Sequence, residues 1–287
     1  MELVYTGNMV EIFKLSQRLY FRRANLPLRQ QGNSVFIVGE SGVAIVDPST
    51  VEAAEEMLAE IALLFGKPLR YVFLTHNHPD HAEGLPVFFK LPVTVFCSHK
   101  CAEEIGRIND GAAAIAGVRG SLSFLLDGYR VELVALDDAA HSPWDMLVRL
   151  PEERAVCTGD LVVEFESLFF HYANPERWVA NLRELALGRD EYVLPGHGGV
   201  YPATMITDVA DFLETLIFAA RECIDRFMPV LGPFTARDPD YATLDRYVAE
   251  YLAEDTPTTR ELREKARGDA QRELRMMVRC LFYRELV

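Results

Sequence analysis

The sequence has few histidines, scattered cysteines and no long apolar run, and each shortage excludes a class of protein. No stretch approaches the roughly 18 to 20 apolar residues of a membrane span, so we expect no membrane partner. The five cysteines form no CxxC pair, which argues against zinc knuckles and disulfide frameworks. The first residues, MELVYTGNMV, contain an early acid and no apolar signal core, so we expect a cytoplasmic location.

Positive charge is also in short supply. The chain has 287 residues, of which 29 are lysine or arginine and 43 are acidic, and its formal net charge is -14. Such a charge repels nucleic-acid phosphates and anionic lipid surfaces, so nucleic acid is not an expected partner. Hydrophobic residues make up 49% of the chain, as in ordinary globular proteins. We therefore expect a globular protein that acts on a small molecule.

Up to about residue 200, short apolar runs alternate with helical patterns, which predicts an α/β fold. Residues 34–38 and 43–46 flank a glycine-bounded turn and predict a hairpin. A helix is expected over 51–65, because its apolar residues recur at spacings of three and four, and a strand over 71–75. Further strands are expected at 93–97, 129–135, 146–150, 155–157 and 192–194.

After Pro202 the pattern becomes helical, with segments expected at 205–228, 241–252 and 258–286. Proline-containing loops are expected at 229–239 and 254–257. We therefore divide the chain into a domain at 1–203 and a helical region at 204–287 that caps the site or packs on it. The last helix places five apolar residues on one face, which fits packing on the body, a lid or a homodimer surface. These residues are Leu274, Met277, Val278, Leu281 and Phe282.

The strongest signal for chemistry is a histidine cluster. The chain has seven histidines, and His76, His78 and His81 fall within the string THNHPDHAEG, together with Asp80. The cluster follows an apolar strand, at the kind of edge where α/β proteins place ligands. Residues two apart in an extended segment share a face, so His76 and His78 could bind one ion while Asp80 and His81 turn toward a second. Imidazole and carboxylate ligands suit zinc, iron or manganese.

The string THNHPDHAEG resembles the HxHxDHxxG signature of the metallo-β-lactamase superfamily, and three later motifs match that family in order. His141 lies in AAHSPWD, Asp160 in CTGDL and His197 in LPGHGG. The resemblance runs from about residue 33 to 199. It implies an αβ/βα sandwich, with two sheets face to face, helices outside and metals at one edge. It also implies two metal sites bridged by Asp160, one formed by His76, His78 and His141 and the other by Asp80, His81 and His197.

The resemblance also points to residues around the ligands. Asp47, in VAIVDPS, matches an aspartate beneath the metal loop, where it would orient ligands; a simple helix N-cap or turn residue is the alternative. His171 and Tyr172 lie in a segment that resembles the family's substrate-facing loop, and Trp144 follows His141 closely. These three residues are candidates for lining the substrate pocket, with support of the fold as the alternative.

Some residues differ from those typical of particular branches of the superfamily, and these differences narrow the choice of branch. Asp160 and the absence of a signal separate the chain from secreted β-lactamases, and Asn77 stands where glyoxalase-II-like enzymes usually carry histidine. His78 stands where the diiron flavoproteins carry glutamate. What remains resembles the lactonase and acyl-thioesterase branch.

We therefore predict a dinuclear metal-dependent hydrolase that cleaves a small ester, thioester or lactone with hydroxide generated at the metals. Two divalent ions are the expected cofactors, with zinc first and iron or manganese as alternatives. Asp80 is the candidate catalytic residue, because it could orient the hydroxide or carry its proton to the leaving group. Two other functions stay open: a persulfide dioxygenase-like enzyme with a single iron, and a regulatory protein that binds a ligand and keeps the metal site as structure.

Overall fold

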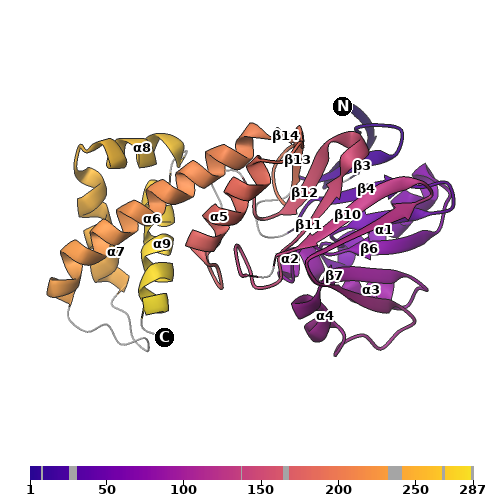
Figure 1. The fold of residues 1–287 in the computed structure, drawn as a ribbon, viewed down its shortest axis with the longest axis horizontal. Coiled ribbons are helices and arrows are strands. Elements are labelled where there is room, and N and C mark those ends of the chain that lie inside the picture. Colours follow the sequence, from indigo (N-terminus) through magenta and orange to yellow (C-terminus); the bar gives the residue numbers. More distant parts are fainter. Residues whose placement is uncertain are drawn as a thin grey trace.

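The structure is a computed structural model in which a body of two β-sheets is joined to a group of helices (Figure 1). It describes residues 1–7, 9–25, 31–136, 138–163, 168–231, 241–266 and 269–285. The long helix α6 (Thr204–Leu231) leaves the body and runs through the helical group. In the described part of the chain, no helix is long and apolar enough to cross a membrane.

The first sheet has eight strands in the order β1-β2-β3-β4-β5-β6-β7-β8. Its first five strands pair antiparallel, and β5 to β8 pair parallel. Parallel pairing requires crossovers, which the helices between these strands supply. The strands are β1 (Glu2–Thr6), β2 (Val10–Lys14), β3 (Leu19–Ala24), β4 (Ser34–Val38), β5 (Val43–Val46), β6 (Leu69–Phe73), β7 (Thr94–Ser98) and β8 (Ala114–Val118).

The second sheet has six strands in the order β14-β13-β12-β11-β10-β9. The pair β12 and β13 is parallel, and the other pairs are antiparallel. The strands are β9 (Ser121–Leu126), β10 (Tyr129–Ala135), β11 (Met146–Leu150), β12 (Ala155–Gly159), β13 (Tyr192–Pro195) and β14 (Tyr201–Pro202).

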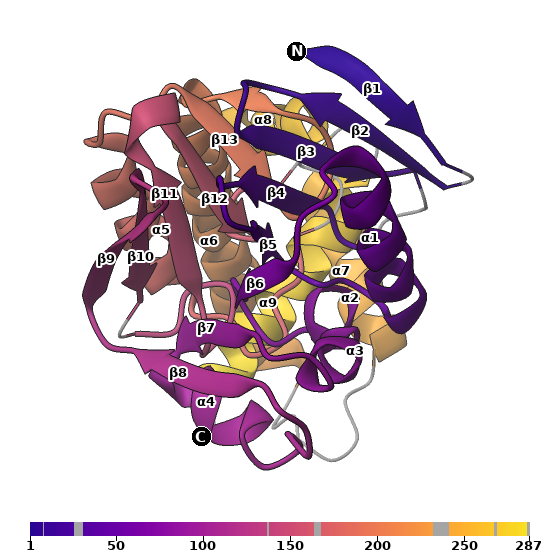
Figure 2. The same ribbon diagram turned by 90° about the vertical axis from the view of Figure 1, so that its right-hand side faces the viewer.

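The helices lie outside the two sheets, as Figure 2 shows for α1 and α3 on one side and α5 and α6 on the other. The side chain of Thr50 caps α1 by accepting a hydrogen bond from the Ala53 N–H. Besides α6, the described helices are α1 (Val51–Leu64), α2 (Pro79–Ala82), α3 (Leu85–Phe89), α4 (His99–Ile105), the 3-10 turn η1 (Pro151–Glu153), α5 (Pro175–Ala186), α7 (Tyr241–Ala253), α8 (Pro257–Lys265) and α9 (Ala270–Glu285).

Alternation along the strands builds the sandwich. On β4, Val35 and Ile37 join the apolar cluster between the sheets, whereas Phe36 and Val38 join the cluster beneath α1 and α3. Because successive side chains of a strand point to opposite faces, one buried strand supplies both layers. The predicted αβ/βα sandwich with a helical C-terminal region is therefore confirmed.

The helical region packs directly on the body. One apolar cluster includes Leu161 and Phe170 of the body together with Leu216 of α6 and Met277 of α9. Four residues of the predicted stripe on the last helix, Leu274, Met277, Val278 and Leu281, are buried in this cluster. The side chain of Phe282 lies outside the described residues. The stripe is thus used within the chain, and the division at 203 stays a prediction.

Several element boundaries differ from the sequence prediction. The strand expected at 71–75 is β6 at Leu69–Phe73, and the single helix expected over 258–286 is two helices, α8 and α9. In the sequence between those helices stands Gly268, a poor helix former, although the apolar residues keep their helical spacing across it. The helix α6 continues to Leu231, two residues beyond Pro229, and the rest of the loop expected at 229–239 lies outside the described residues.

Candidate metal centre

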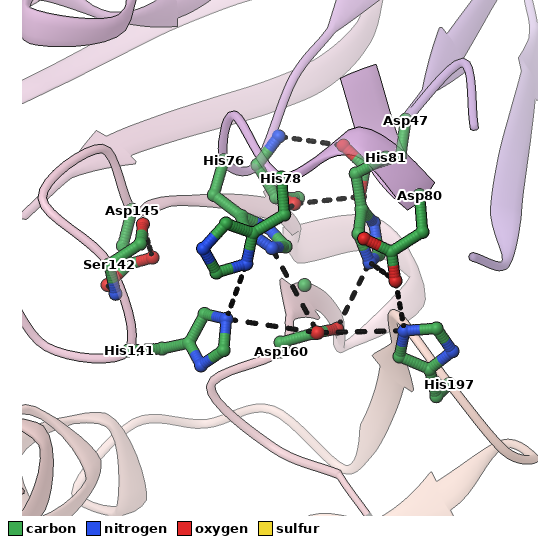
Figure 3. A network of polar contacts seen from close by, with 12 residues as sticks. Asp47, His76, His78, Asp80, His81, His141, Ser142, Asp145, Asp160 and His197 are labelled. Atoms are coloured by element: carbon green, nitrogen blue, oxygen red, sulfur yellow. Dashed lines mark hydrogen bonds and ion pairs between the residues drawn. The ribbon is translucent and has the colours of Figure 1, made fainter. Parts of the chain in front are cut away.

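The structure brings all seven predicted ligand residues together in two groups that share Asp160 (Figure 3). The first group is His76, His78, His141 and Asp160, and the second is Asp80, His81, Asp160 and His197. Within each group the possible ligand atoms all lie within 4.8 Å of one another.

Strand ends place these side chains at one edge of the sandwich. His76 and His78 follow β6, while His81 lies on the short helix α2. Asp160 comes directly after β12, and His197 follows β13, the parallel neighbour of β12. Because the carboxyl ends of parallel strands open on the same edge, motifs far apart in sequence converge there.

A polar turn holds the loop that carries His141. The carboxylate of Asp145 accepts hydrogen bonds from the Ser142 N–H at 2.9 Å and from the Ser142 Oγ at 2.5 Å (Figure 3). Burial raises the pKa of Asp145 to about 7, although the hydrogen bonds from Ser142 lower it. The turn fixes the backbone next to His141 before β11 begins.

In the first group, the nitrogen atoms face a common centre. His78 Nδ1 lies 3.1 Å from His141 Nε2. Asp160 Oδ2 lies 4.0 Å from His76 Nε2 and 3.8 Å from His141 Nε2. Three imidazoles and one carboxylate oxygen therefore surround one point, a donor set that suits zinc and its neighbours.

Burial keeps these three imidazoles neutral. Burial is the largest cause of the shift in both His76 and His78. It lowers the pKa of His76 well below the ordinary range and also lowers the pKa of His78. It also lowers the pKa of His141 to about 3, against the opposing charge of Asp160. A neutral imidazole offers a lone pair, so these histidines need lose no proton to bind a metal at neutral pH.

The second group contains two carboxylates, one more than the first. His197 Nε2 lies 3.0 Å from Asp80 Oδ2 and 3.6 Å from Asp160 Oδ2. Asp160 Oδ1 lies 3.2 Å from His81 Nε2. This group therefore offers two imidazoles and two carboxylates. Asp160 Oδ1 faces His81, whereas Oδ2 lies between His197 and the histidines of the first group.

The electrostatics of the second group favour a cation. Burial by itself would lower the pKa of His81, but the charge of Asp160, the hydrogen bonds with Asp160 and Asp47, and the charge of Asp80 raise it well above its usual value. Burial would raise the pKa of Asp160, but His197, His81 and His76 hold it well below the usual range. The carboxylates that stabilise a protonated His81 would also stabilise a metal ion.

The residues present fit a pair of divalent metals. His76 Nε2, His81 Nε2 and Asp160 Oδ1 are buried and form no hydrogen bond in the described part of the chain. Such atoms are costly to bury unless something binds them, and a metal would do so. Glycine makes room for them, because a Cβ at Gly196 would lie 2.2 Å from Asp160 Oδ1 and 2.5 Å from His81 Cε1.

Asp47 lies beneath the metal loop. Its Oδ2 accepts a hydrogen bond from the Thr75 Oγ1 at 2.7 Å and lies 3.0 Å from His81 Nδ1, while its Oδ1 accepts the Thr75 N–H at 2.7 Å. Its φ is 56°, a left-handed conformation that is uncommon outside glycine, asparagine and aspartate. The N-cap of α1 is Thr50, so Asp47 contacts the metal loop and does not cap that helix.

The three candidate pocket residues also lie beside the metal groups. Trp144 is half-buried, with its ring centroid 6.1 Å from that of His78, and His171 and Tyr172 are exposed and in contact with each other. Sequence reasoning missed Thr75, Glu104 and Phe169. Thr75 lies inside the string THNHPDHAEG and Phe169 lies two residues before the candidate His171, but nothing in the sequence marks Glu104.

A family model described as the metallo-beta-lactamase superfamily matches residues 28–197, which is more than half of the chain. This chain belongs to the metallo-beta-lactamase superfamily. The match ends at His197, so it includes every predicted ligand position. The predicted family is therefore confirmed.

Solved members of the superfamily show the same fold. A metallo-beta-lactamase from Pontibacter korlensis superposes with a TM-score of 0.64 at 19% identity, covering 71% of this chain and 99% of that one. A metallo-beta-lactamase from Erythrobacter litoralis gives a TM-score of 0.61 at 17% identity, covering 74% of this chain and 99% of that one.

One curated relative carries the name of an activity. An atrochrysone carboxyl ACP thioesterase from Aspergillus fumigatus is 27% identical over 175 residues, 60% of this chain. The chain spans about half of that relative, because the match covers 53% of it. Superfamily membership and this relative agree with the expectation that the chain is an enzyme of the hydrolase class.

Proposed function

We propose that this chain is a dinuclear metal-dependent hydrolase that cleaves a small ester, thioester or lactone, with a thioester as the first candidate. The observation that carries the proposal is the pair of ligand groups sharing Asp160. Two divalent ions bound there, zinc first and iron or manganese as alternatives, would supply an activated water and charge stabilisation for the carbonyl oxygen.

The residues of the chain would have separate roles in holding the metals and orienting the ligands. His76, His78 and His141 would hold one ion, Asp80, His81 and His197 the other, and Asp160 would bridge them. Asp47 would orient His81 through Nδ1, as partners behind metal ligands commonly do. This arrangement needs no serine or cysteine nucleophile.

Asp80 is the proposed catalytic residue. Its side chain is 15% exposed, so it can reach solvent or substrate, and its Oδ2 lies 3.0 Å from His197 Nε2. Burial would raise the pKa of Asp80, but the hydrogen bond with His197 and the charge of His81 bring it below its usual value. At neutral pH the carboxylate is therefore ionised, and Oδ2 can orient the attacking water and accept its proton.

The curated relative supports a thioester as the first candidate, because it is named as a thioesterase. The lactone and the simple ester remain in the proposal because the attack on their carbonyl groups needs the same residues. We further propose that residues 1–203 hold the metals and that 204–287 support one side of the site. A cytoplasmic location and a homodimer stay predictions from the sequence.

The test compares protein stripped with a chelator with the same protein reloaded with zinc, iron or manganese. We expect hydrolysis of a thioester, ester and lactone panel to require reloading. Asp160→Ala should lower turnover at least about a hundredfold, since it removes a carboxylate from both groups. Equal hydrolysis by stripped protein, or by Asp160→Ala, would contradict the proposal.

The same samples separate the alternative enzyme class. Oxygen uptake with a persulfide by iron-loaded protein, without hydrolysis of the panel, would assign the dioxygenase function instead. Asp127→Asn is the matched control, because it changes an exposed aspartate that bonds Ser41 and contacts no ligand.

A further inference from the structure

Five side-chain rings form a closed circuit next to the first ligand group. His78 contacts Trp144 and Phe169, with ring centroids 6.1 and 5.4 Å apart and nearly perpendicular planes. Trp144 contacts Tyr172 at 6.0 Å, Tyr172 contacts His171 at 4.0 Å, and His171 contacts Phe169 at 5.9 Å. We call Trp144, Phe169, His171 and Tyr172 the aromatic collar. A candidate metal ligand, His78, completes the circuit.

The collar is accessible from solvent. Tyr172 is 60% exposed and His171 is also exposed, whereas Trp144 and Phe169 are partly buried and His78 is buried. Two exposed and two partly buried rings lie together beside the candidate metal groups, and adjoining aromatic surface of this kind is typical of a binding site. Burial of the rings therefore increases from the exposed Tyr172 to the buried candidate ligand His78.

Glu104 fixes one side of the collar. Its Oε1 accepts a hydrogen bond from the Trp144 indole Nε1 at 2.9 Å, and its Oε2 accepts one from Asn77 Nδ2 at 3.0 Å. Asn77 lies between the ligands His76 and His78. One carboxylate on α4 therefore ties the indole to the metal loop and restricts rotation of both side chains.

The opposite side of the collar is held by the backbone. Tyr172 has a φ of 70°, a left-handed conformation that is costly for a bulky residue and persists where surrounding contacts hold it. The flanking residues Phe170 and Ala173 are buried in the cluster that contains α6 and α9. Cys280 of α9 donates to the Ala173 carbonyl oxygen at 3.7 Å. The helical region thus braces the loop that presents Tyr172.

We propose that the aromatic collar receives a planar, apolar acyl group of the substrate, and that Glu104 is the positioning residue that holds its Trp144 side. Flat rings stack on or contact the edges of other rings with about 0.5–1.5 kcal/mol beyond simple burial. The collar touches His78, so an acyl group seated on it has its carbonyl next to the ligand groups. This inference rests on the proposed hydrolase function and names the class of acyl group.

The test uses three thioesters of N-acetylcysteamine that differ only in the acyl group: benzoyl, cyclohexanecarbonyl and acetyl. In Trp144→Leu we expect kcat/KM for the benzoyl thioester to fall about tenfold relative to acetyl, mainly through KM. The cyclohexanecarbonyl thioester should lose less, because its ring is not flat. Each comparison is a ratio to the unmodified chain, so the different intrinsic reactivities cancel.

Glu104 is tested with a graded series. Glu104→Ala should lower the benzoyl-to-acetyl preference about threefold, and Glu104→Gln should restore part of it because one acceptor oxygen remains. Glu103→Ala, the exposed neighbour on α4, is the matched control and should leave the preference unchanged. A preference in Glu104→Ala equal to that of the control would overturn the positioning role.

A binding measurement separates failure of the collar from failure of the hydrolase. Calorimetry would measure the binding affinity of the ketone analogue of the benzoyl thioester. In this analogue a methylene replaces the sulfur, so the compound is not cleaved. The collar predicts weaker binding to Trp144→Leu than to the unmodified chain, even if no thioester is hydrolysed. Equal affinity, or an equal loss of kcat/KM for all three thioesters, would overturn the collar.

Discussion

Asp47 contacts the loop that carries the candidate ligands His76 and His78, and also His81. Both of its oxygens accept hydrogen bonds from Thr75, and one of them also faces His81 Nδ1. The sequence left two functions for Asp47 open, and the contacts favour the one that orients a ligand. The left-handed backbone at this position makes asparagine the least disruptive replacement.

We expect Asp47→Asn to weaken metal binding about 10- to 100-fold while leaving the fold intact. An amide offers one acceptor oxygen where the carboxylate offers two, so Thr75 and His81 can no longer both be satisfied. Competition with a metal chelator measures the affinity. Asp127→Asn is the control, because Asp127 is also left-handed, at φ 51°, but bonds the exposed Ser41. Unchanged affinity in Asp47→Asn would show that Asp47 does not support the ligands.

The first four candidate ligands could be predicted from a local string with unusual residue types, whereas His141, Asp160 and His197 were predicted only through the family resemblance. His76, His78 and His81 stand within six residues, and the strings around Asp160 and His197 follow strands. Glu104 could not be found in this way. Its two hydrogen bonds join residues 27 and 40 positions away, and no local pattern marks an exposed glutamate on a helix.

At the scale of elements, α9 contains a buried acid. Glu273 is fully buried, with one oxygen bonded to Arg272 Nη1 at 2.7 Å and the other without a hydrogen-bond partner in the described part of the chain. Burial, more than any other cause, raises the pKa of Glu273 to about 7, and Asp269 adds to the rise while Arg272 opposes it. The folded state therefore favours the protonated acid.

This shift makes α9 sensitive to pH. The pKa of Glu273 in the folded chain lies above the ordinary 4.5, so ionising this buried acid destabilises the fold. The loss of stability is absent below about pH 4.5, grows as the pH rises toward 7, and is complete above it. The difference between these two pKa values corresponds to a loss of roughly 3 kcal/mol, at most, in the free energy of unfolding. We expect Glu273→Gln to raise the free energy of unfolding by about 1–3 kcal/mol at pH 8.5, and by less than about 1 kcal/mol at pH 5.

Denaturant unfolding at the two pH values checks this prediction. The exposed Glu264 on α8 supplies the control, because Glu264→Gln should change stability little at either pH. A gain for Glu273→Gln that is the same at pH 5 and pH 8.5 would show that the carboxyl does not titrate in this way.

The elements differed in how well the sequence predicted them. The hairpin of β4 and β5 and the strands β10 and β11 have the predicted bounds, because turns and alternation mark both ends. The N-terminal strands β1 to β3 were missed, and β1 is largely exposed, so its residues show little alternation. The division between α8 and α9 was also missed, because their apolar residues continue one helical pattern across Gly268.

At the scale of the whole molecule, the helical region and the body share one apolar cluster. The cluster includes Trp178 of α5 and Met277 of α9, which lie about 100 positions apart in the chain. Sequence patterns predicted the helices but not this contact, because the apolar face of a helix does not show which surface it packs against.

We therefore expect the chain to unfold as one cooperative unit. Met277→Ala should lower the free energy of unfolding by about 2–5 kcal/mol, because it leaves a cavity in the shared cluster. Trp178, in the body, should report the same lowered midpoint as the helical circular-dichroism signal. Leu187→Ala, at a leucine that is 86% exposed, is the control. Two separate transitions, with only the helical one shifted, would indicate independent domains.

The seven candidate ligand residues are proposed to hold two metal ions. The most direct test is the number of ions per chain in the intact protein, measured by native mass spectrometry together with elemental analysis. We predict two divalent ions per chain in the unmodified protein and at most one in Asp160→Ala. A metal-saturated chain that binds only one ion, or an Asp160→Ala variant that still binds two, would contradict this prediction.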